Sequence, residues 1–305
     1  MSETNSSMRV GMTALILGVL LFSTIEVAAK LMQTNGAVAG KFPFWLACFR
    51  SVMTGLMLAP LAMKSLRQRG VCLIGRDVLV ISGVGLVGVA LMSSLFHLGI
   101  TFLPANIAAL LFSCNPVFVV LFAALFLSEK ITLRNIAAIG LCLAGVFVLA
   151  RDRADGLSLT GILLMAGATL TFALYTVFSK KIIPRYGALP VTAFAALTGG
   201  IILLPIALVL EGAPFESYGL VDWAGMFYLA TFGTAIGFFL YIYGIGHVSA
   251  GAGSMVFFLK PFAAAFFAWL VLGEKFNTPE CIAGAFILTG MVVALAPART
   301  NRCYK

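Results

Sequence analysis

The sequence predicts an all-α integral membrane protein with ten transmembrane helices, arranged as two inverted-topology five-helix repeats. Three observations lead to this fold class: the composition, a series of apolar segments of similar length, and an internal repeat. Of the 305 residues, 61% are hydrophobic and only 10% are charged, whereas an ordinary soluble domain has about 25% charged residues. Because so few charges cannot cover a surface that faces water, the chain is expected to lie in a bilayer.

Each apolar segment is long enough to cross a membrane as a helix, which takes roughly 20 residues. The first segment follows a single Arg9, as a signal peptide would, but it is too long for a signal-peptide core and carries Glu26, so we expect a retained helix. The connections are too short for a separate soluble domain. The expected spans are approximately 12–32, 42–62, 78–101, 104–127, 132–150, 157–181, 190–210, 222–245, 248–271 and 278–296.

The distribution of basic residues predicts the orientation. Thirteen Lys and Arg lie on the face that holds both termini, among them Lys64, Arg76 and Lys130, against about five on the opposite face, which carries most of the Asp and Glu. Because cytoplasmic loops are enriched in Lys and Arg, we expect both termini in the cytoplasm and a place in the cytoplasmic (inner) membrane. The same bias explains the net charge of +9 without a nucleic-acid partner.

An internal repeat relates the two halves of the chain. Residues 248–277 (VSAGAGSMVFFLKPFAAAFFAWLVLGEKFN) realign, 145 positions on, with residues 103–132 (LPANIAALLFSCNPVFVVLFAALFLSEKIT). Each unit holds five helices, an odd number, so the second unit enters the membrane upside down relative to the first. Inverted repeats of this kind are typical of alternating-access transporters. We expect one repeat in residues 1–150 and the other, with a short cytoplasmic tail, in residues 151–305.

These blocks, with Arg50 in FWLACFRSVMTGLMLAP and with LYTVFSKK at 174–181, resemble the two EamA-type repeats of the drug/metabolite transporter superfamily. The resemblance covers nearly the whole chain and implies a ten-helix fold and the transport of small metabolites, with export favoured. It leaves the substrate open, because the superfamily carries amino acids, organic cations, sugar derivatives and more. The chain also departs from the family pattern, with TFLPA at 101–105 in place of an aromatic-Thr-Ser-Ala signature.

Charged side chains inside the spans are candidate functional groups, because each costs about 2.5–3.5 kcal/mol at a helix centre. Glu26 and Lys30 share one helix face at a spacing of four residues and can neutralise each other. Glu26 is a candidate for proton coupling or for receiving a substrate ammonium group, with Lys30 as its partner. The alternative is a static ion pair that fixes helix packing.

The centres of spans 4 and 9 carry matching polar–proline pairs, Asn115-Pro116 and Lys260-Pro261. A proline bends a helix and frees a backbone carbonyl, so these pairs are candidate helix kinks beside a substrate site. Alternatively, the prolines serve packing alone. Arg50, near the centre of span 2, either contacts substrate or holds helix carbonyls together.

Two uncharged candidates complete the predicted substrate site, Tyr175 and His97, both as cavity-lining residues. The six cysteines show no CxxC spacing and predict neither a metal site nor a disulfide framework. GVGLVG at 83–88 spells a dinucleotide fingerprint but lacks the strand–helix context, so its glycines are expected to allow close helix packing. We therefore expect no cofactor.

The sequence as a whole favours a secondary active transporter over an enzyme, since no nucleophile–base or metal constellation is present. The charges of the expected cavity lean positive, which suits a carboxylate; an amino acid or related zwitterion is the first candidate and an organic anion the second. Protons are a candidate coupling ion. Uptake or exchange of another small organic ion, and a non-transporting scaffold or sensor, are the alternatives. Both a monomer and a homodimer fit the sequence.

Overall fold

The structure, a computed structural model, describes residues 2–34, 42–103, 111–151, 158–213, 218–272 and 278–295. Over these ranges the chain is almost entirely helical and has no β-strand. Seven helical stretches in the described part are long and apolar enough to cross a membrane, and shorter apolar helices accompany them. The prediction of an all-α membrane protein is confirmed.

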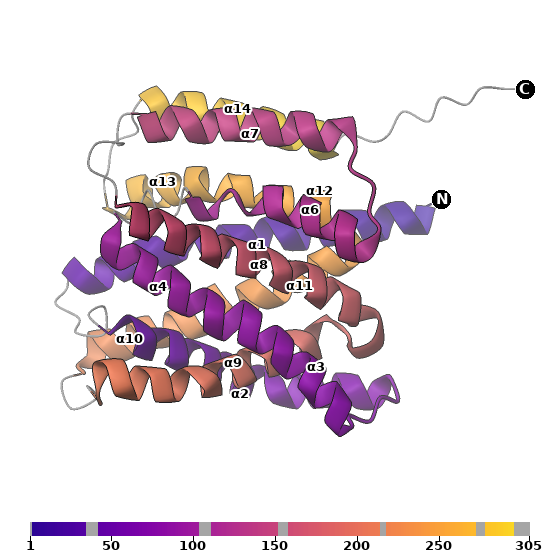
Figure 1. Cartoon of the computed structure of the whole chain (residues 1–305), viewed down its shortest axis with the longest axis vertical. Helices are drawn as coiled ribbons and strands as arrows, with labels where there is room; N and C mark the ends of the chain where they lie inside the picture. Colours follow the sequence, from indigo (N-terminus) through magenta and orange to yellow (C-terminus); the bar gives the residue numbers. More distant parts are fainter. Residues whose placement is uncertain are drawn as a thin grey trace, which may run out of the picture.

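The first repeat supplies five membrane-crossing segments, one of which passes through a π-helix (Figure 1). They are α1 (Ser2–Thr34), α2 (Pro43–Gln68), the run α3 (Gly75–Gly85), η2 (Leu86–Leu91) and α4 (Met92–Phe102), then α6 (Asn115–Leu127) and α7 (Leu133–Arg151).

The second repeat supplies the other five in the same pattern. They are α8 (Leu159–Tyr186), α9 (Ala188–Glu211), the run α10 (Leu220–Tyr228), η4 (Leu229–Ile236) and α11 (Gly237–His247), the run α12 (Ala250–Ser254), η5 (Met255–Phe258) and α13 (Leu259–Leu272), and α14 (Thr278–Leu295).

Helix boundaries differ from the expected spans mainly at the ends. The first helix begins ten residues earlier than expected, at Ser2, and α2 continues to Gln68 rather than stopping near 62. Hydropathy marks only the part of a helix inside the hydrocarbon, whereas the backbone hydrogen bonds continue into the polar headgroup region. The first part of expected span 4, residues 104–110, lies outside the described residues.

The third span of each repeat contains a π-helical segment in its middle, which the sequence did not predict. The repeat offset of 145 carries η2, 86–91, onto 231–236, within η4. In a π-helix the hydrogen bonds reach one residue further than in an α-helix, which widens the turn, and such segments are frequent at functional sites. Two related π-helical segments therefore mark related places in the two repeats.

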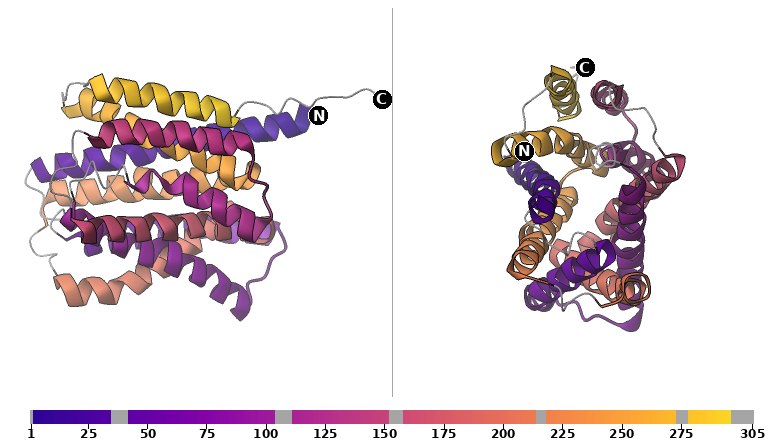
Figure 2. Two further views of the ribbon diagram at one scale, coloured as in Figure 1. Left: turned by 45° about the horizontal axis from the view of Figure 1, so that its top comes forward. Right: turned by 90° about the vertical axis from the view of Figure 1, so that its left-hand side faces the viewer.

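The two repeats are interlocked rather than side by side. Helix α1 packs mainly against α11 and α13 of the second repeat, and α8 packs mainly against α4 and α6 of the first. Helices α2 and α9 pack along their length, while α7 and α14 form a pair set to one side of the bundle (Figures 1 and 2). The first helix of each repeat thus belongs spatially to the third and fourth spans of the other.

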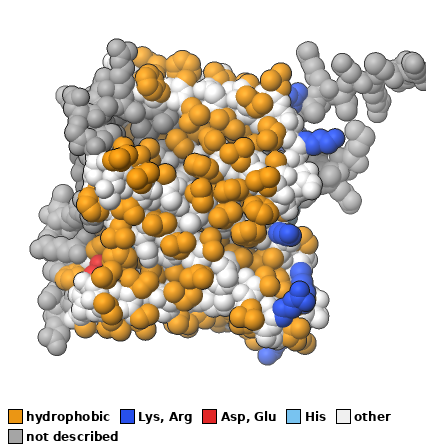
Figure 3. Space-filling view, viewed as in Figure 1, with side chains coloured by type: hydrophobic (Ala, Val, Ile, Leu, Met, Phe, Trp, Pro, Cys, Tyr) orange, Lys and Arg blue, Asp and Glu red, His pale blue; other side chains and the backbone are white. Residues whose placement is uncertain are grey.

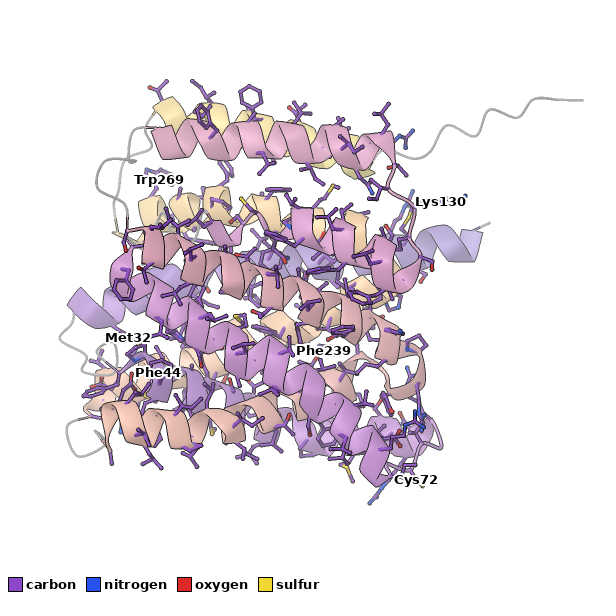
Figure 4. All side chains as sticks on the ribbon, viewed as in Figure 1. Met32, Phe44, Cys72, Lys130, Phe239 and Trp269 are labelled. Atoms are coloured by element: carbon purple, nitrogen blue, oxygen red, sulfur yellow. The ribbon has the colours of Figure 1, made fainter. Side chains whose placement is uncertain are left out.

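The outer surface matches a bilayer-embedded protein. Apolar side chains cover most of the face seen in Figure 3, and Lys and Arg gather at one end of the bundle. We call this the basic end; helices α2 and α8 end there, with the exposed Arg67 and Arg185 in their last turns. Figure 4 shows Lys130 and Cys72 there and Phe44 at the other end. That other end, called the acidic end, carries Glu211 and Asp222, from α9 and α10.

Candidate functional site

A small pocket with both polar and apolar side chains in its wall, called here the central pocket, lies between helices of the two repeats. Its free volume is about 10 Å³, roughly the room that one water molecule needs. Both π-helical runs and both of the closely packed helices α2 and α9 contribute to its wall, so it lies where the two repeats meet. Its polar lining consists of Arg50, Ser51, Thr54, Ser93, Tyr175, Thr192 and Thr234.

The hydroxyl groups of this pocket offer acceptor oxygens. Ser51, Thr192 and Thr234 donate their hydrogens to carbonyls of their own helices, at 2.7, 3.0 and 2.8 Å. Thr54 donates across to the carbonyl of Ala230 in η4, at 3.1 Å. A hydroxyl has one hydrogen and two lone pairs, so each group that has already donated can only accept from a molecule in the pocket.

Arg50 supplies the complementary charge. It lies in α2 with Thr54 one turn further on, so the guanidinium and the hydroxyl share one face of the helix. Arginine stays protonated at any accessible pH and presents a planar set of donors. His97, from α4, is close enough to interact electrostatically with Arg50, and its ring packs edge-on against Phe96. His97 therefore lies beside the central pocket but does not line it.

Tyr175 joins the pocket to an aromatic cluster, which consists of Phe112, Phe172, Tyr175, Phe238, Tyr241 and Phe257. Tyr175 is fully buried on α8 and lies against Gly88 of η2, where a Cβ atom would come within 2.0 Å of the ring. Its ring lies 5.9 Å from that of Phe172 and 6.2 Å from that of Phe238. Only a glycine at position 88 allows this approach, and Gly85 lies similarly close to Ala195 of α9, which supports the interpretation of these two GVGLVG glycines as packing residues. Gly83, the first glycine of the run, has no such neighbour, because an added Cβ there would meet nothing within 4 Å.

Lys260 and Asn115 lie at the far side of the aromatic cluster. The Lys260 ammonium is 5.6 Å from the centroid of the Phe112 ring, within cation–π range, and the residue is buried. Asn115 is fully buried beside the hydroxyl of Tyr241, and neither atom of its amide has a hydrogen bond of full geometry within the described part of the chain. The Tyr241 hydroxyl is paired instead with Thr176, at 3.2 Å.

The helix is interrupted just before each of the two central prolines. A turn at 113–114 precedes α6, in which Pro116 is the second residue, and the 3₁₀ segment η5 precedes α13, in which Pro261 is the third. Proline lacks the N–H of a continuous helix and clashes with the preceding turn, which accounts for both breaks. Helix α1 is held at the second break, because the Ser23 hydroxyl contacts the carbonyl of Lys260, at 3.3 Å.

The structure does not bring all the predicted residues to one place. Arg50 and Tyr175 line the central pocket, and Lys260 and Asn115 lie apart from it, across the aromatic cluster. Glu26 and Lys30 lie on α1, and their side chains are outside the described residues, so their pairing stays a prediction.

Comparison with known proteins identifies the family. The profile of the EamA-like transporter family matches residues 9–151 and 159–296. The chain belongs to this family. The resemblance predicted from the repeat blocks is therefore confirmed, and the family assignment covers both halves of the chain. Transport, rather than catalysis, is what this family and its named members are described as doing.

Several curated relatives of this EamA-like chain are similar over nearly their whole length. An uncharacterized transporter of Clostridium kluyveri is 31% identical, covering 94% of this chain and 93% of the relative. A probable terminal-alkyne amino-acid exporter of Streptantibioticus cattleyicolor is 27% identical, covering 92% and 91%. The uncharacterized inner membrane transporter YicL of Salmonella typhimurium is 27% identical, covering 96% and 97%. A solved crystal structure superposes with a TM-score of 0.74 at 22% identity, covering 95% of this chain and 96% of the other, which shows that the two chains share a fold.

The hydroxyl lining is the part of this EamA-like site that sequence reasoning missed. Ser and Thr are common in membrane helices, so none of them stands out by composition. One signal was nevertheless present: Ser51 and Thr54 lie one and four positions after Arg50. A hydroxyl four residues from an intramembrane arginine lies on the same helix face and belongs to the same polar surface.

Proposed function

We propose that this chain is a secondary active transporter that exports a small zwitterion, an amino acid or a close derivative, across the inner membrane. The observation that carries the proposal is the composition of the central pocket, where one guanidinium faces hydroxyl oxygens that have already donated their hydrogens. The family membership supports transport in general, and the pocket chemistry supports the substrate class.

The two halves of a zwitterion match the two kinds of group in the pocket. Arg50 can bind a carboxylate through two parallel charge-assisted hydrogen bonds. The oxygens of Thr54, Thr192 and Thr234 can accept hydrogen bonds from an ammonium group, which has three hydrogens and no lone pair. A simple carboxylate would use only the first interaction and a simple amine only the second, so a zwitterion uses the pocket more fully.

The pocket is closed in the structure, which fits one stage of an alternating-access cycle. A volume of about 10 Å³ holds no amino acid, since ligand pockets typically measure about 300–1,000 Å³. The helices around the pocket must therefore move apart to admit substrate. We propose that Lys260 and Asn115 then join the same cavity, with His97 and Tyr175 in its wall, and that Glu26, with Lys30, couples transport to protons.

Two further observations support direction and orientation. The relative described as a probable terminal-alkyne amino-acid exporter supports both the amino-acid class and export. The Lys and Arg at the basic end support a cytoplasmic location for that end and for both termini, because cytoplasmic surfaces of membrane proteins are enriched in basic residues.

Flux measurements in liposomes test the proposal. Protein is reconstituted with internal amino acids, organic acids, amines or nucleosides, and the exchange of a labelled solute is followed. We expect exchange with amino acids. Arg50→Lys keeps the charge but loses the planar pair of donors, so we expect KM to rise about tenfold or more, the equivalent of one lost hydrogen bond to a charged group.

The same panel can contradict the proposal. Exchange only with amines or nucleosides, or an Arg50→Lys variant with unchanged KM for every transported amino acid, would show that the pocket does not bind a carboxylate. Thr289→Val serves as a control variant that should leave KM unchanged. Thr289 on α14 donates to a carbonyl of its own helix, at 2.7 Å, as the pocket threonines Thr192 and Thr234 do, but it lies outside the pocket.

A further inference from the structure

A polar cluster outside the central pocket joins three segments at the basic end. It is built around Glu129, two residues after the last residue of α6, Leu127. Between them Ser128 adopts a left-handed conformation with φ of 55°, a conformation uncommon for a residue with a side chain. This residue turns the chain sharply at the end of the helix, and Glu129 follows directly.

The Glu129 carboxylate binds the first residues of α12 with both oxygens. The N–H of Ala250 donates to Oε1 at 2.8 Å, and the N–H of Gly251 donates to Oε2 at 3.2 Å. These N–H groups have no partner within the helix, and a negative charge at a helix start is favourable. The backbone approaches closely, because a Cβ at position 251 would lie 3.2 Å from Val120 of α6.

Lys180 completes the cluster from α8. Its ammonium lies 3.0 Å from Oε1 of Glu129, and it also donates to the carbonyl of Val248, just before α12. Lys180 thus neutralises the carboxylate and contacts the segment that the carboxylate holds. Both side chains are about one-fifth exposed, so water reaches the ion pair. Separation of the two groups therefore does not leave either charge buried without solvent.

The cluster connects two sets of helices, α4, α6 and α8 in the first set and α1, α11 and α13 in the second. Helices α6 and α8 pack together with α4, whereas α12 continues into α13, which packs against α1 of the other set. Glu129 and Lys180 belong to the first set, and the three backbone groups they hold belong to the second. For the central pocket to open toward the basic end, these sets must part there.

We propose that Glu129 and Lys180 form a clamp that closes the transport path at the basic end and must release α12 before the path opens on that side. The clamp acts on access to the central pocket, not on substrate chemistry. It rests on the proposed transport function, but its test below uses no substrate, so the two can fail separately.

The acidic end offers a control of the same chemistry. There the carboxylate of Glu211 accepts from the N–H groups of Phe44 and Trp45, at 3.0 and 2.9 Å, at the start of α2. This contact joins α2 and α9, which pack along their whole length. Loss of the Glu211 charge should weaken the hydrogen bonds at the start of α2 but should not separate the two sets of helices.

Thiol labelling measures whether the clamp controls access. Ser179 is fully buried, one residue before Lys180 and one turn from Tyr175 of the pocket wall, so Ser179→Cys places a reporter between pocket and clamp. The natural Cys48, buried in α2 toward the acidic end, is a second reporter in the same molecule. Purified protein in lipid nanodiscs is treated with a bulky water-soluble maleimide, and modification at each position is followed by peptide mass spectrometry.

We expect Glu129→Gln to raise the labelling rate at position 179 about tenfold or more, as for the loss of one charge-assisted hydrogen bond, with Cys48 unchanged. Glu211→Gln should leave position 179 unchanged. Lys180→Gln should raise the labelling rate at position 179 less, because the hydrogen bonds from α12 to Glu129 remain. This second variant tests the clamp if Glu129→Gln does not fold. Equal rates in the parent, Glu129→Gln and Lys180→Gln would overturn the clamp, and so would a parallel rise at Cys48, which would indicate general loosening.

Discussion

Gly88→Ala should displace Tyr175 from the central pocket. An added Cβ at this position would lie 2.0, 2.3 and 2.4 Å from three atoms of Tyr175, whereas atoms in contact sit about 3.5–4.0 Å apart. The ring, or helix α8 itself, must therefore move by roughly 1.5 Å. Because Tyr175 is fully buried among other aromatic rings, it has no free space to enter.

Overpacking of this kind costs about 1–3 kcal/mol, against a gain of up to about 1 kcal/mol from replacing glycine in a helix. We expect a net loss of stability, seen as a lower apparent Tm in a thermal-shift assay, and a loss of flux, because the pocket wall moves. Gly83→Ala is the matched control: Gly83 belongs to the same GVGLVG run, and an added Cβ there meets nothing within 4 Å. If both variants retain the parent's Tm and flux, the packing of Tyr175 on Gly88 described above is incorrect.

Three further predictions address the other candidate residues. Asn115→Leu should raise stability by up to about 1–3 kcal/mol, because it removes a buried amide that has no hydrogen bond of full geometry, while flux falls. The control is Asn135→Leu, which breaks a hydrogen bond to Thr132 and should not stabilise. A destabilised, fully active Asn115→Leu would contradict a role in substrate binding. Glu26→Gln should abolish the pH dependence of flux if Glu26 couples protons, and an unchanged pH profile would identify a static ion pair. If Lys30 pairs with Glu26, a charge reversal at Lys30 should impair flux and a second reversal at Glu26 should restore it. The repeat register aligns Lys180 with Lys30 and Glu129 with Glu274, 150 and 145 positions apart, so rescue by a reversal at Glu274 instead of Glu26 would contradict the Glu26–Lys30 pair.

The fold could be predicted because a bilayer restricts the chain strongly. Only helices of roughly 20 apolar residues satisfy the backbone inside hydrocarbon, and an odd number of them per repeat dictates inversion. Which helices become neighbours could not be predicted, because hydropathy carries no information on partners. The exchange by which α1 joins α11 and α13, and α8 joins α4 and α6, appears only in the structure.

Apart from Tyr175, the candidate site was predictable only where a residue is costly in a membrane. Arg50 and Lys260 stand out as intramembrane charges, but the sequence grouped them by charge alone, and the structure separates them by an aromatic cluster. The π-helical segments have no compositional signal, since a shift of hydrogen bonding by one residue leaves hydropathy unchanged. The contacts of Glu129 were hidden because an acid beside Lys130 at a span end has the composition of an ordinary interface cap.

The central claim is that hydroxyl oxygens of the pocket bind the ammonium group of a zwitterion whose carboxylate is held by Arg50. The most direct test is the ratio of Kd values for a transported amino acid and for the same molecule without its amino group, measured for the parent and for Thr54→Val. Valine keeps the shape of threonine but has no oxygen, so the account predicts that the amino acid binds roughly 10- to 100-fold more weakly while the deaminated acid binds as before. Equal weakening of both ligands, or of neither, would contradict it.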